Sequence, residues 1–375
     1  MAMIIAHKIR LNPTVEQEAY FVQACNASRV VWNWALAQWK ASLLAGEKPT
    51  AIKLKKQFNS IKREQFAWVC QVTKSAAEQA FIDLGQAFSN FFKNPSHFGY
   101  PKFKKKGKSK ESFYLANDQF KIDGHRIRIP KLDKYTGVKK LWWVNMSEKV
   151  RFQGRIMGAR VSRVANFWYI AISVEVPEPV SLHPCVGSAV GVDLGIKQLA
   201  TLSTGEVYAN IQAMRQNQKR LVGLSRQLAK REKGSKRWQV TKQKIQRTHQ
   251  KIANQRQDHI HKMTHYLTSN YEFIALEDLN VTGMLNNHKL AKSISDASFG
   301  EIVRQIEYKA KRFNGKVQKV NRWFPSSKIC SCCGTKNAKL MLSERTYNCI
   351  NPKCGLSIDR DLNAALNILR EGLRI

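Results

Sequence analysis

The sequence lacks long apolar runs and has few acidic residues. No stretch is long and apolar enough to span a bilayer, and "MAMIIAHKIRLNPT" at the start alternates like a strand, unlike a signal peptide. Of 375 residues, 27 are Asp or Glu and 63 are Lys or Arg, a net charge of +36. So large a positive surplus favours a polyanionic partner, usually nucleic acid, with a membrane surface as the alternative. We therefore expect a soluble, intracellular protein that binds nucleic acid and no membrane.

The cysteines lack the distribution of a disulfide framework. Cys25, Cys70 and Cys185 are scattered, while the other five of the eight gather near the end of the chain. In a cytosolic protein, clustered pairs favour a metal over disulfides.

Two cysteine pairs have the spacing of a zinc ribbon. They are Cys330-x2-Cys333 and Cys349-x4-Cys354, separated by 15 residues, and a glycine follows the second cysteine of each pair. Four thiolates would close the coordination shell of a structural Zn²⁺. Cys332 is the surplus thiol, which could replace Cys333 only at a tighter spacing. The alternative is a group of four reduced, buried thiols.

The first half of the chain combines a helical block with short strands. Residues 1–12 resemble a strand within the first segment, 1–13. Thr14 with Gln17 has the spacing of a capping box that opens a helical block over 14–110. From 111 to 180 the period changes to two in "FKIDGHRIRIP", "EKVRFQG", "ARVSRV" and "FWYIAISVEV". Strands this short suggest a small barrel or sandwich, in which the helical block is an insertion. "PEPVSLHPC" then resembles a linker.

The second half alternates strands and helices. "AVGVDLGIKQLATLSTGEVYA" predicts two or three strands, and residues 211–269 a basic helical pair that turns at "KGS". "EFIALEDL" and "KVQKVN" predict strands, "SFGEIVRQIEYKAKRF" and "DLNAALNILREGL" helices. This order is that of the RNase H-like fold. The expected fold class is therefore multidomain α+β, with an RNase H-like α/β domain over 186–327 and 356–375 and the ribbon inserted at 328–355.

Three acids lie where that fold would gather a catalytic site. Asp193 sits in the strand "VGVDLGI", where a lone acid is costly unless paired or metal-bound. Glu277 ends another strand, and we prefer it to its neighbour Asp278 on position alone. Asp361 lies in the first turn of the last helix, where it or Asp359 could instead only cap the helix.

Such carboxylates suit metal-dependent phosphodiester hydrolysis. Two divalent ions about 4 Å apart can clamp the attacking and leaving oxygens, and Mg²⁺ prefers oxygen ligands and retains waters. In the alternative, Asp193 is only an acid at a turn, and Asp359 and Asp361 only cap the last helix. Their combination predicts a nuclease site.

Candidate nucleic-acid contacts are less specific. Polar residues at the helix start "TKSAAEQAF", which we expect to be exposed, and in the loop "LANDQ" suit base edges: Lys74, Ser75, Glu78, Asn117 and Gln119. Basic residues that suit phosphates are Lys104, Lys105, Arg226, Arg231, Arg247 and Arg256. Ordinary surface is the alternative for each.

With these residues, the chain resembles the TnpB family, RNA-guided DNA nucleases of bacterial insertion sequences that are related to type V CRISPR effectors. The segments that carry the resemblance are "GVDLGIKQLAT", "RQDHIHKMTHYL", "IALEDLNVTGM", "FPSSKICSCCG" and "DRDLNAALNI". It implies a split RuvC nuclease domain with Asp193, Glu277 and Asp361 as catalytic, Mg²⁺-binding acids. The cysteine pairs match the family's zinc-containing target-nucleic-acid-binding insertion. The one difference is that four residues separate Cys349 from Cys354, where two are common in the family.

The resemblance also implies domains, partners and a reaction. The barrel, of the oligonucleotide-binding type, would be the wedge domain and the helical insertion the recognition domain. A monomer in the cytoplasm of a bacterial or archaeal cell would bind a transposon-encoded guide RNA (omega RNA) and read a short transposon-associated motif. It would then cut double-stranded DNA with two Mg²⁺, or Mn²⁺ in their place.

Three other functions remain open at this point. A nuclease-inactive, RNA-guided repressor should lack one of the acids, and this chain retains all three. An unguided RNase H-like nuclease or transposase would need no RNA. A zinc-ribbon binding module with purely structural acids would bind without magnesium and never cleave.

Overall fold

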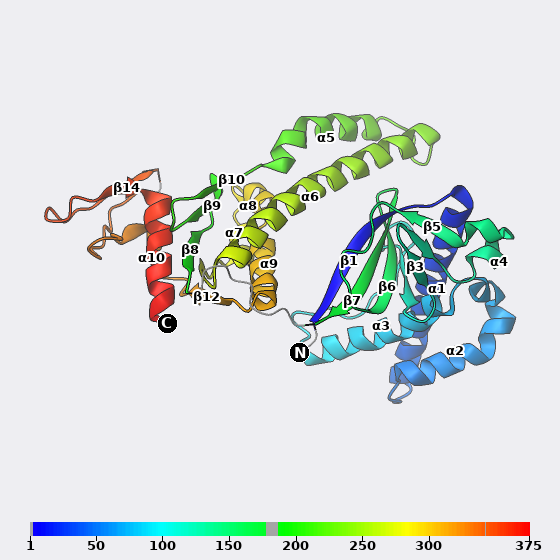
Figure 1. Cartoon of the computed structure of the whole chain (residues 1–375). Coiled ribbons are helices and arrows are strands. Elements are labelled where there is room, and N and C mark those ends of the chain that lie inside the picture. Colours follow the sequence, from blue (N-terminus) through cyan, green and yellow to red (C-terminus); the bar gives the residue numbers. More distant parts are fainter. Residues whose placement is uncertain (1–2, 178–186, 342) are drawn as a thin grey trace. The chain divides into compact units, whose positions relative to one another are not determined.

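The computed structural model describes residues 3–177, 187–341 and 343–375, which divide into two compact units (Figure 1). The first unit ends at Pro177, and the second contains the remainder of the chain. Apart from Pro177, the expected linker lies outside the described residues. Among the described helices, none is long and apolar enough to cross a membrane.

The first unit is a seven-stranded antiparallel sheet packed against helices. Its order is β2-β6-β7-β1-β5-β4-β3. The strands are β1 (Met3–Asn12), β2 (Ser112–Ala116), β3 (Lys121–Asp123), β4 (Arg126–Arg128), β5 (Trp143–Met146), β6 (Arg155–Val164) and β7 (Phe167–Val176). β2 and β3 are the edges of this order, so closure into a wedge barrel stays a prediction.

Helices are inserted between β1 and β2, where the sequence predicts them. They are α1 (Val15–Leu44), α2 (Ala51–Gln65) and α3 (Lys74–Lys93), with α4 (Leu132–Thr136) later. Thr14 and Gln17 form the predicted capping box of α1. Tyr20 and Phe21 of α1 pack on Phe113 of β2, so helices and sheet share one core.

One predicted strand of this unit is wrong. The segment "EKVRFQG" over 148–154 alternates in sequence but forms no strand. Instead, the Arg151 backbone N–H donates to Nδ1 of buried His7. The His7 side chain accepts the backbone hydrogen bond that a neighbouring strand would otherwise accept. The alternating sequence therefore does not pair into a sheet here.

The second unit contains a five-stranded mixed sheet of order β10-β9-β8-β11-β12. β8 (Ala189–Asp193), β9 (Gln198–Leu202) and β10 (Val207–Ala209) are antiparallel neighbours. β11 (Phe273–Glu277) is parallel to both β8 and β12 (Lys316–Val320). The element order predicted for an RNase H-like domain is therefore present.

Helices cover both faces of this sheet (Figure 1). Ile274 and Leu276 pack with α6 (Lys236–Asn270) and α9 (Phe299–Arg312), while Ala275 packs with Ile368 of α10 (Arg360–Arg374). The alternation of side chains along β11 produces these two cores. The other helices are α5 (Ala213–Ala229), which forms the predicted pair with α6, α7 (Val281–Leu285) and α8 (Ala291–Ala297).

A small ribbon lies in sequence between β12 and α10. It begins after the short 3-10 segment η3 (Ser326–Lys328) and contains β13 (Thr346–Asn348) paired with β14 (Ser357–Asp359). Its core is Cys330, Leu340 and Tyr347. So few apolar residues give little burial, which makes a second stabilising contribution necessary.

Candidate active site and cysteine cluster

The sheet and α10 place the three predicted acids in one neighbourhood. Asp193 ends β8 and Glu277 ends β11; in these parallel neighbours Val192 lies beside Leu276. The carboxyl ends of both strands therefore meet at one edge. Asp361 lies in the first turn of α10, which packs directly on β8.

Asp193 has a strongly perturbed acidity. Burial, with the charges of Glu277 and Asp361 adding to it, raises the pKa of its carboxyl to about 8, while Arg360 opposes the shift. Carboxylates that raise the pKa of Asp193 in this way are near enough to interact with it through space. Titratable groups perturbed in this way are typical of functional sites.

Glu277 is oriented by a hydroxyl that sequence reasoning did not single out. Ser326 of η3 is buried, and its Oγ donates to Oε1 of Glu277 at 2.5 Å. Burial raises the pKa of Glu277, and this hydrogen bond opposes the shift. The neighbouring Asp278 faces a different partner, since its carboxylate accepts from Arg322 at 2.6 Å.

The two aspartates of α10 have different surroundings. Asp359 is the N-cap, and its Oδ1 accepts from the backbone N–H groups of Asp361 (2.9 Å) and Leu362 (3.1 Å). Asp361 is inside the helix, where its charge acts on Asp193. Asp361 is therefore not the N-cap, although as an acid of the first turn it also suits the helix dipole.

Two buried asparagines of α10 hold the segment that leads into the ribbon. Asn363 donates to the Ile329 carbonyl (2.7 Å) and accepts from the Ser331 N–H (2.9 Å). Asn367 donates to the carbonyls of Ser326 (2.8 Å) and Ile329 (2.6 Å). The helix that carries Asp361 thus also fixes the hydroxyl beside Glu277.

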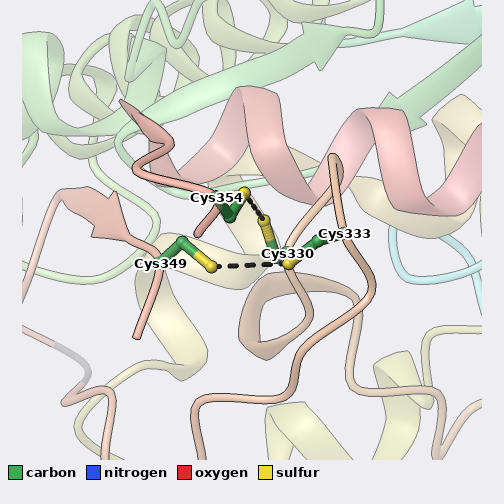
Figure 2. A group of neighbouring side chains, drawn as sticks. All are labelled: Cys330, Cys333, Cys349 and Cys354. Carbon is green, nitrogen blue, oxygen red and sulfur yellow. Dashed lines mark hydrogen bonds between the residues drawn. The ribbon is translucent and has the colours of Figure 1, made fainter. Parts of the chain in front are cut away.

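Figure 2 shows the four cysteines of the ribbon facing one another. Sγ of Cys330 lies 3.7 Å from Sγ of Cys354, and Sγ of Cys333 lies 3.5 Å from Sγ of Cys349. Sulfurs that bind one tetrahedral zinc at 2.3 Å are about 3.8 Å apart. The spacing and the all-thiol donor set therefore fit Zn²⁺, and the exposed Cys332 is outside the group.

Local backbone conformations bring these thiols together. Gly334 (φ 78°) and Gly355 (φ 62°) are left-handed directly after the second cysteine of each pair, a conformation that favours glycine. The Gly334 N–H returns to the Cys330 carbonyl at 3.0 Å. Hydrogen bonds with the side chain and backbone of Thr335 hold the pKa of the Cys333 thiol below its ordinary value, which favours the thiolate.

The acids are less tightly gathered than the cysteines. Among the described residues, the four cysteines are the one group of three or more His, Cys, Asp or Glu side chains close enough to share an ion. Magnesium binding at Asp193, Glu277 and Asp361 therefore stays a prediction.

The predicted base-contacting residues are only partly exposed. Lys74 and Asn117 are exposed, whereas Ser75 is buried, so the expectation that the Ser75 hydroxyl faces solvent is wrong. The reason is that Ser75 Oγ donates to Gln119 Oε1 at 2.8 Å, which joins α3 to the β2–β3 loop. Glu78 forms an ion pair with Lys55 at 3.2 Å.

Of the residues predicted to contact phosphates, some are exposed and others already have partners within the protein. Lys105, Arg226 and Arg247 are exposed. Arg256 pairs with buried Asp296 at 2.8 Å, and Arg231 donates to the Arg237 carbonyl at 2.6 Å where α5 turns into α6. These two arginines have structural partners. Half-buried Lys104 lies 3.8 Å from the centre of the Trp32 ring.

Family models match most of the chain. Residues 171–288 match the model described as "Probable transposase" of the IS605 OrfB type, and 299–368 match "Cas12f1-like, TNB domain". Residues 1–48 match a model described as "Helix-turn-helix domain", although the structure has one strand and one helix there, β1 and α1.

Relatives extend the similarity to nearly the full length. A Streptomyces pristinaespiralis protein named "Putative RNA-guided DNA endonuclease" is 32% identical over 98% of this chain and 89% of its own. The chain belongs to the TnpB family. Another TnpB relative, "Putative RNA-guided DNA endonuclease InsQ" of Escherichia coli K12, is 32% identical over 99% of this chain and 93% of its own.

A solved structure shows that this TnpB chain has a Cas12f-like fold. The protein of a Cas12f1–sgRNA–target DNA complex aligns with a TM-score of 0.58 and 14% identity over 98% of both chains. At that identity the similarity establishes the fold alone. The second unit accordingly has a RuvC-like fold and carries a four-cysteine cluster.

Proposed function

We propose that this protein is an RNA-guided DNA endonuclease that cuts double-stranded DNA by metal-dependent hydrolysis. The observation that carries the proposal is that Asp193, Glu277 and Asp361 lie together at one edge of the RuvC-like sheet, where burial and then the charges of the other two acids raise the pKa of Asp193 to about 8. Mutual repulsion of this kind is costly in a folded chain unless a cation or a proton relieves it. The names of the relatives, and the RNA and DNA in the similar Cas12f1 complex, support this activity.

The donor set of the site suits magnesium. Asp193, Glu277 and Asp361 offer carboxylate oxygens, the ligands that Mg²⁺ prefers, and would hold two Mg²⁺ or Mn²⁺ ions. When bound, such ions activate water and neutralise charge that develops on the phosphate. The chain must supply all three carboxylates in ionised form, because a protonated carboxyl is a weak ligand.

Surrounding residues prepare the acids for that role. Ser326 donates to one oxygen of Glu277 and leaves the other oxygen available. Asp359 caps α10 and so fixes the first turn, from which Asp361 projects. Arg360 stabilises the ionised form of Asp193 and also donates to Ser327 Oγ (3.4 Å) in the segment before the ribbon.

The ribbon would hold zinc and a substrate strand. Zn²⁺ at Cys330, Cys333, Cys349 and Cys354 would be structural, because four thiolates leave no open coordination position. The buried asparagines of α10 connect this ribbon to the acid-bearing helix. A strand bound by the ribbon would therefore be held at a fixed position relative to Asp361.

A guide RNA accounts for the charge of the molecule. A net charge of +36 suits a protein that holds an RNA and a DNA backbone together. In guided systems base pairing provides most of the sequence specificity, and protein contacts read a short adjacent motif. We propose that an omega RNA from its own element is the guide, and that Lys74 and Asn117 are candidates for reading the motif.

The direct test is to purify the protein from cells that also express the DNA flanking its gene, and to sequence the bound RNA. One discrete RNA with a constant scaffold and a variable end is expected. With that RNA, wild type should cut matching DNA in Mg²⁺ and Asp193→Ala should bind it without cutting. Guided binding without cleavage by wild type would favour a repressor, and cleavage that survives RNase treatment would favour an unguided nuclease.

A further inference from the structure

One tryptophan is exposed beside the acidic site. Trp323 is 85% exposed, whereas the other eight of the nine tryptophans are buried or half-buried. Indole is large and apolar, so leaving it in water forfeits a substantial hydrophobic gain. Such a side chain is a candidate for binding.

The turn that carries this indole runs from Val320 to Ser326, and both of these end residues lie beside Glu277. Val320, the last residue of β12, is the register partner of Glu277. Ser326, six residues later, donates its hydroxyl to the Glu277 carboxylate. Trp323 is three residues from each anchor, and at 3.8 Å per residue its Cα lies within about 11 Å of both. The turn that carries the indole is therefore tied at both ends to residues that pair with or contact Glu277.

The exposure does not result from a loosely held backbone. Arg322 donates to the Asp278 carboxylate (2.6 Å) and to the Asp278 carbonyl (3.1 Å). Asn321 Oδ1 accepts from the Trp323 N–H at 2.9 Å. Phe324 packs into the cluster of Ala275, Val320 and Ile368, so the residue after Trp323 is anchored in the core. A well-fixed turn thus presents an indole to solvent.

An exposed indole beside a site for phosphodiester chemistry suits an unpaired base of the substrate. Every base has an aromatic face that can stack on an indole, whatever its sequence. In a duplex both faces of an internal base are already covered by its neighbours, so a base that stacks on Trp323 must be unpaired. A phosphodiester that reaches Glu277 brings its adjoining bases within reach of this turn.

We propose that Trp323 is a stacking platform for an unpaired base of the DNA strand that enters the acidic site. The proposal rests on the proposed nuclease function and extends it to a substrate-binding residue. Arg322 and Phe324 are positioning residues, because they hold the turn and not the base. Stacking here would place the strand along the edge that carries the acids.

The test compares two single-stranded probes with the RNA-loaded protein. One is an oligothymidylate, and the other has the same length and phosphates but lacks bases throughout. Asp193→Ala forms the background so that neither probe is cut. Trp323→Ala should bind the oligothymidylate about tenfold more weakly, the size of one stacking contact, and the base-free strand unchanged. Trp323→Phe should restore most of the affinity.

Salt dependence and matched variants separate stacking from other causes. The slope of log K against log salt should be the same for Trp323→Ala and its background, because no phosphate contact is lost. Tyr308→Ala, which truncates a 41% exposed aromatic of α9, should leave both affinities unchanged. Equal weakening toward both probes, or no weakening toward oligothymidylate, would overturn the proposal.

The same preparations distinguish this inference from the proposed function. With the acids intact, the guided complex of wild type is assayed for cleavage in Mg²⁺. Absence of cleavage would count against the nuclease function, whereas the change that Trp323→Ala makes in the ratio of the two affinities is measured without cleavage and tests the stacking contact.

Discussion

At the scale of single residues, the site depends on a hydroxyl that tunes a buried acid. Removing the Ser326 hydroxyl in Ser326→Ala leaves Glu277 without the hydrogen bond that opposes its raised pKa. The ionised form becomes less favourable, so Mg²⁺ competes less well with the proton. Loss of such a supporting contact typically weakens metal affinity 10–100-fold, and we expect the Mg²⁺ concentration for half-maximal cleavage to rise about tenfold.

The matched control is the neighbouring hydroxyl. Ser327→Ala removes a group that contacts Arg360 at 3.4 Å and not Glu277, and should leave the Mg²⁺ requirement unchanged. The prediction fails if both variants shift the magnesium titration equally.

Sequence reasoning at this scale identified charges better than neutral partners. A lone acid at the end of an apolar strand is conspicuous, and the structure does bring Asp193, Glu277 and Asp361 into one electrostatic neighbourhood. Ser326 has no comparable signal, because its importance depends on where η3 folds. The prediction that Ser75 is exposed was wrong for the same reason. A polar helix start suggests exposure, and only the fold shows that Gln119 covers the Ser75 hydroxyl.

At the scale of elements, α10 can approach β8 because Gly191 has no side chain. A Cβ at this position would lie 2.7 Å from the Leu369 backbone nitrogen and closer still to the Ala365 carbonyl oxygen. Backbone atoms cannot move aside easily, so Gly191→Ala should destabilise the protein by about 3 kcal/mol. It should also displace Asp361 and lower cleavage.

Gly223 of α5 provides the control. A Cβ there meets nothing within 4 Å, so Gly223→Ala should stabilise the protein by about 0.5–1 kcal/mol through helix propensity. Denaturant titrations of both variants measure the difference. Equal effects at the two glycines would refute the close approach of α10.

A buried lysine makes the packing of α6 on α9 pH-dependent. Lys309 Nζ donates to the His261 carbonyl (2.9 Å) and to Thr264 Oγ1 (2.7 Å) of α6. Burial, with Arg312 adding to it, lowers the pKa of Lys309 to about 8. Between that pH and 10.5 the unfolded chain binds the proton and the folded chain does not, so the free energy of unfolding rises with pH.

Lys309→Met should remove this contribution. We expect the melting temperature of wild type to rise relative to the variant between about pH 7.5 and 9.5. Replacing exposed Lys311 in the same way should leave the pH profile of wild type intact. A constant difference between wild type and Lys309→Met at both pH values would contradict the assigned shift.

The ribbon should fold only with its metal. Cys330 is fully buried among the thiols, so Cys330→Ser removes a ligand and leaves the small apolar core insufficient. We expect purified wild type to contain about one zinc per chain and Cys330→Ser to contain little. The adjacent Cys332→Ser should retain the full zinc content, since Cys332 is outside the cluster. Equal zinc loss in both variants would disprove the ligand assignment.

Periodicity predicted most elements and failed where tertiary contacts decide. The long helices and the strands of the second unit follow their apolar patterns, since each buries a continuous face. "EKVRFQG" has strand-like alternation but no strand partner, because His7 binds the backbone at Arg151. Strand pairing is non-local, so the order of the seven-stranded sheet could not be obtained from local patterns.

At the scale of the whole molecule, two units serve one proposed reaction. The first offers exposed polar and basic groups such as Lys74, Asn117 and Lys105, and the second carries the acids and the ribbon. The charge surplus predicted a nucleic-acid partner from composition alone. The family was also predictable from sequence, because its motifs lie in fixed order along the chain, whereas the exposed Trp323 turn was visible only in the structure.

The most direct measurement is to change the guide and map the cut. The RNA-loaded protein is given two plasmids that differ only in the target segment, with a guide matched to one and then to the other, in Mg²⁺. The account predicts that the cut moves with the guide and disappears in Asp193→Ala. A cut that stays at one sequence whichever guide is bound, or that persists in Asp193→Ala, would contradict it.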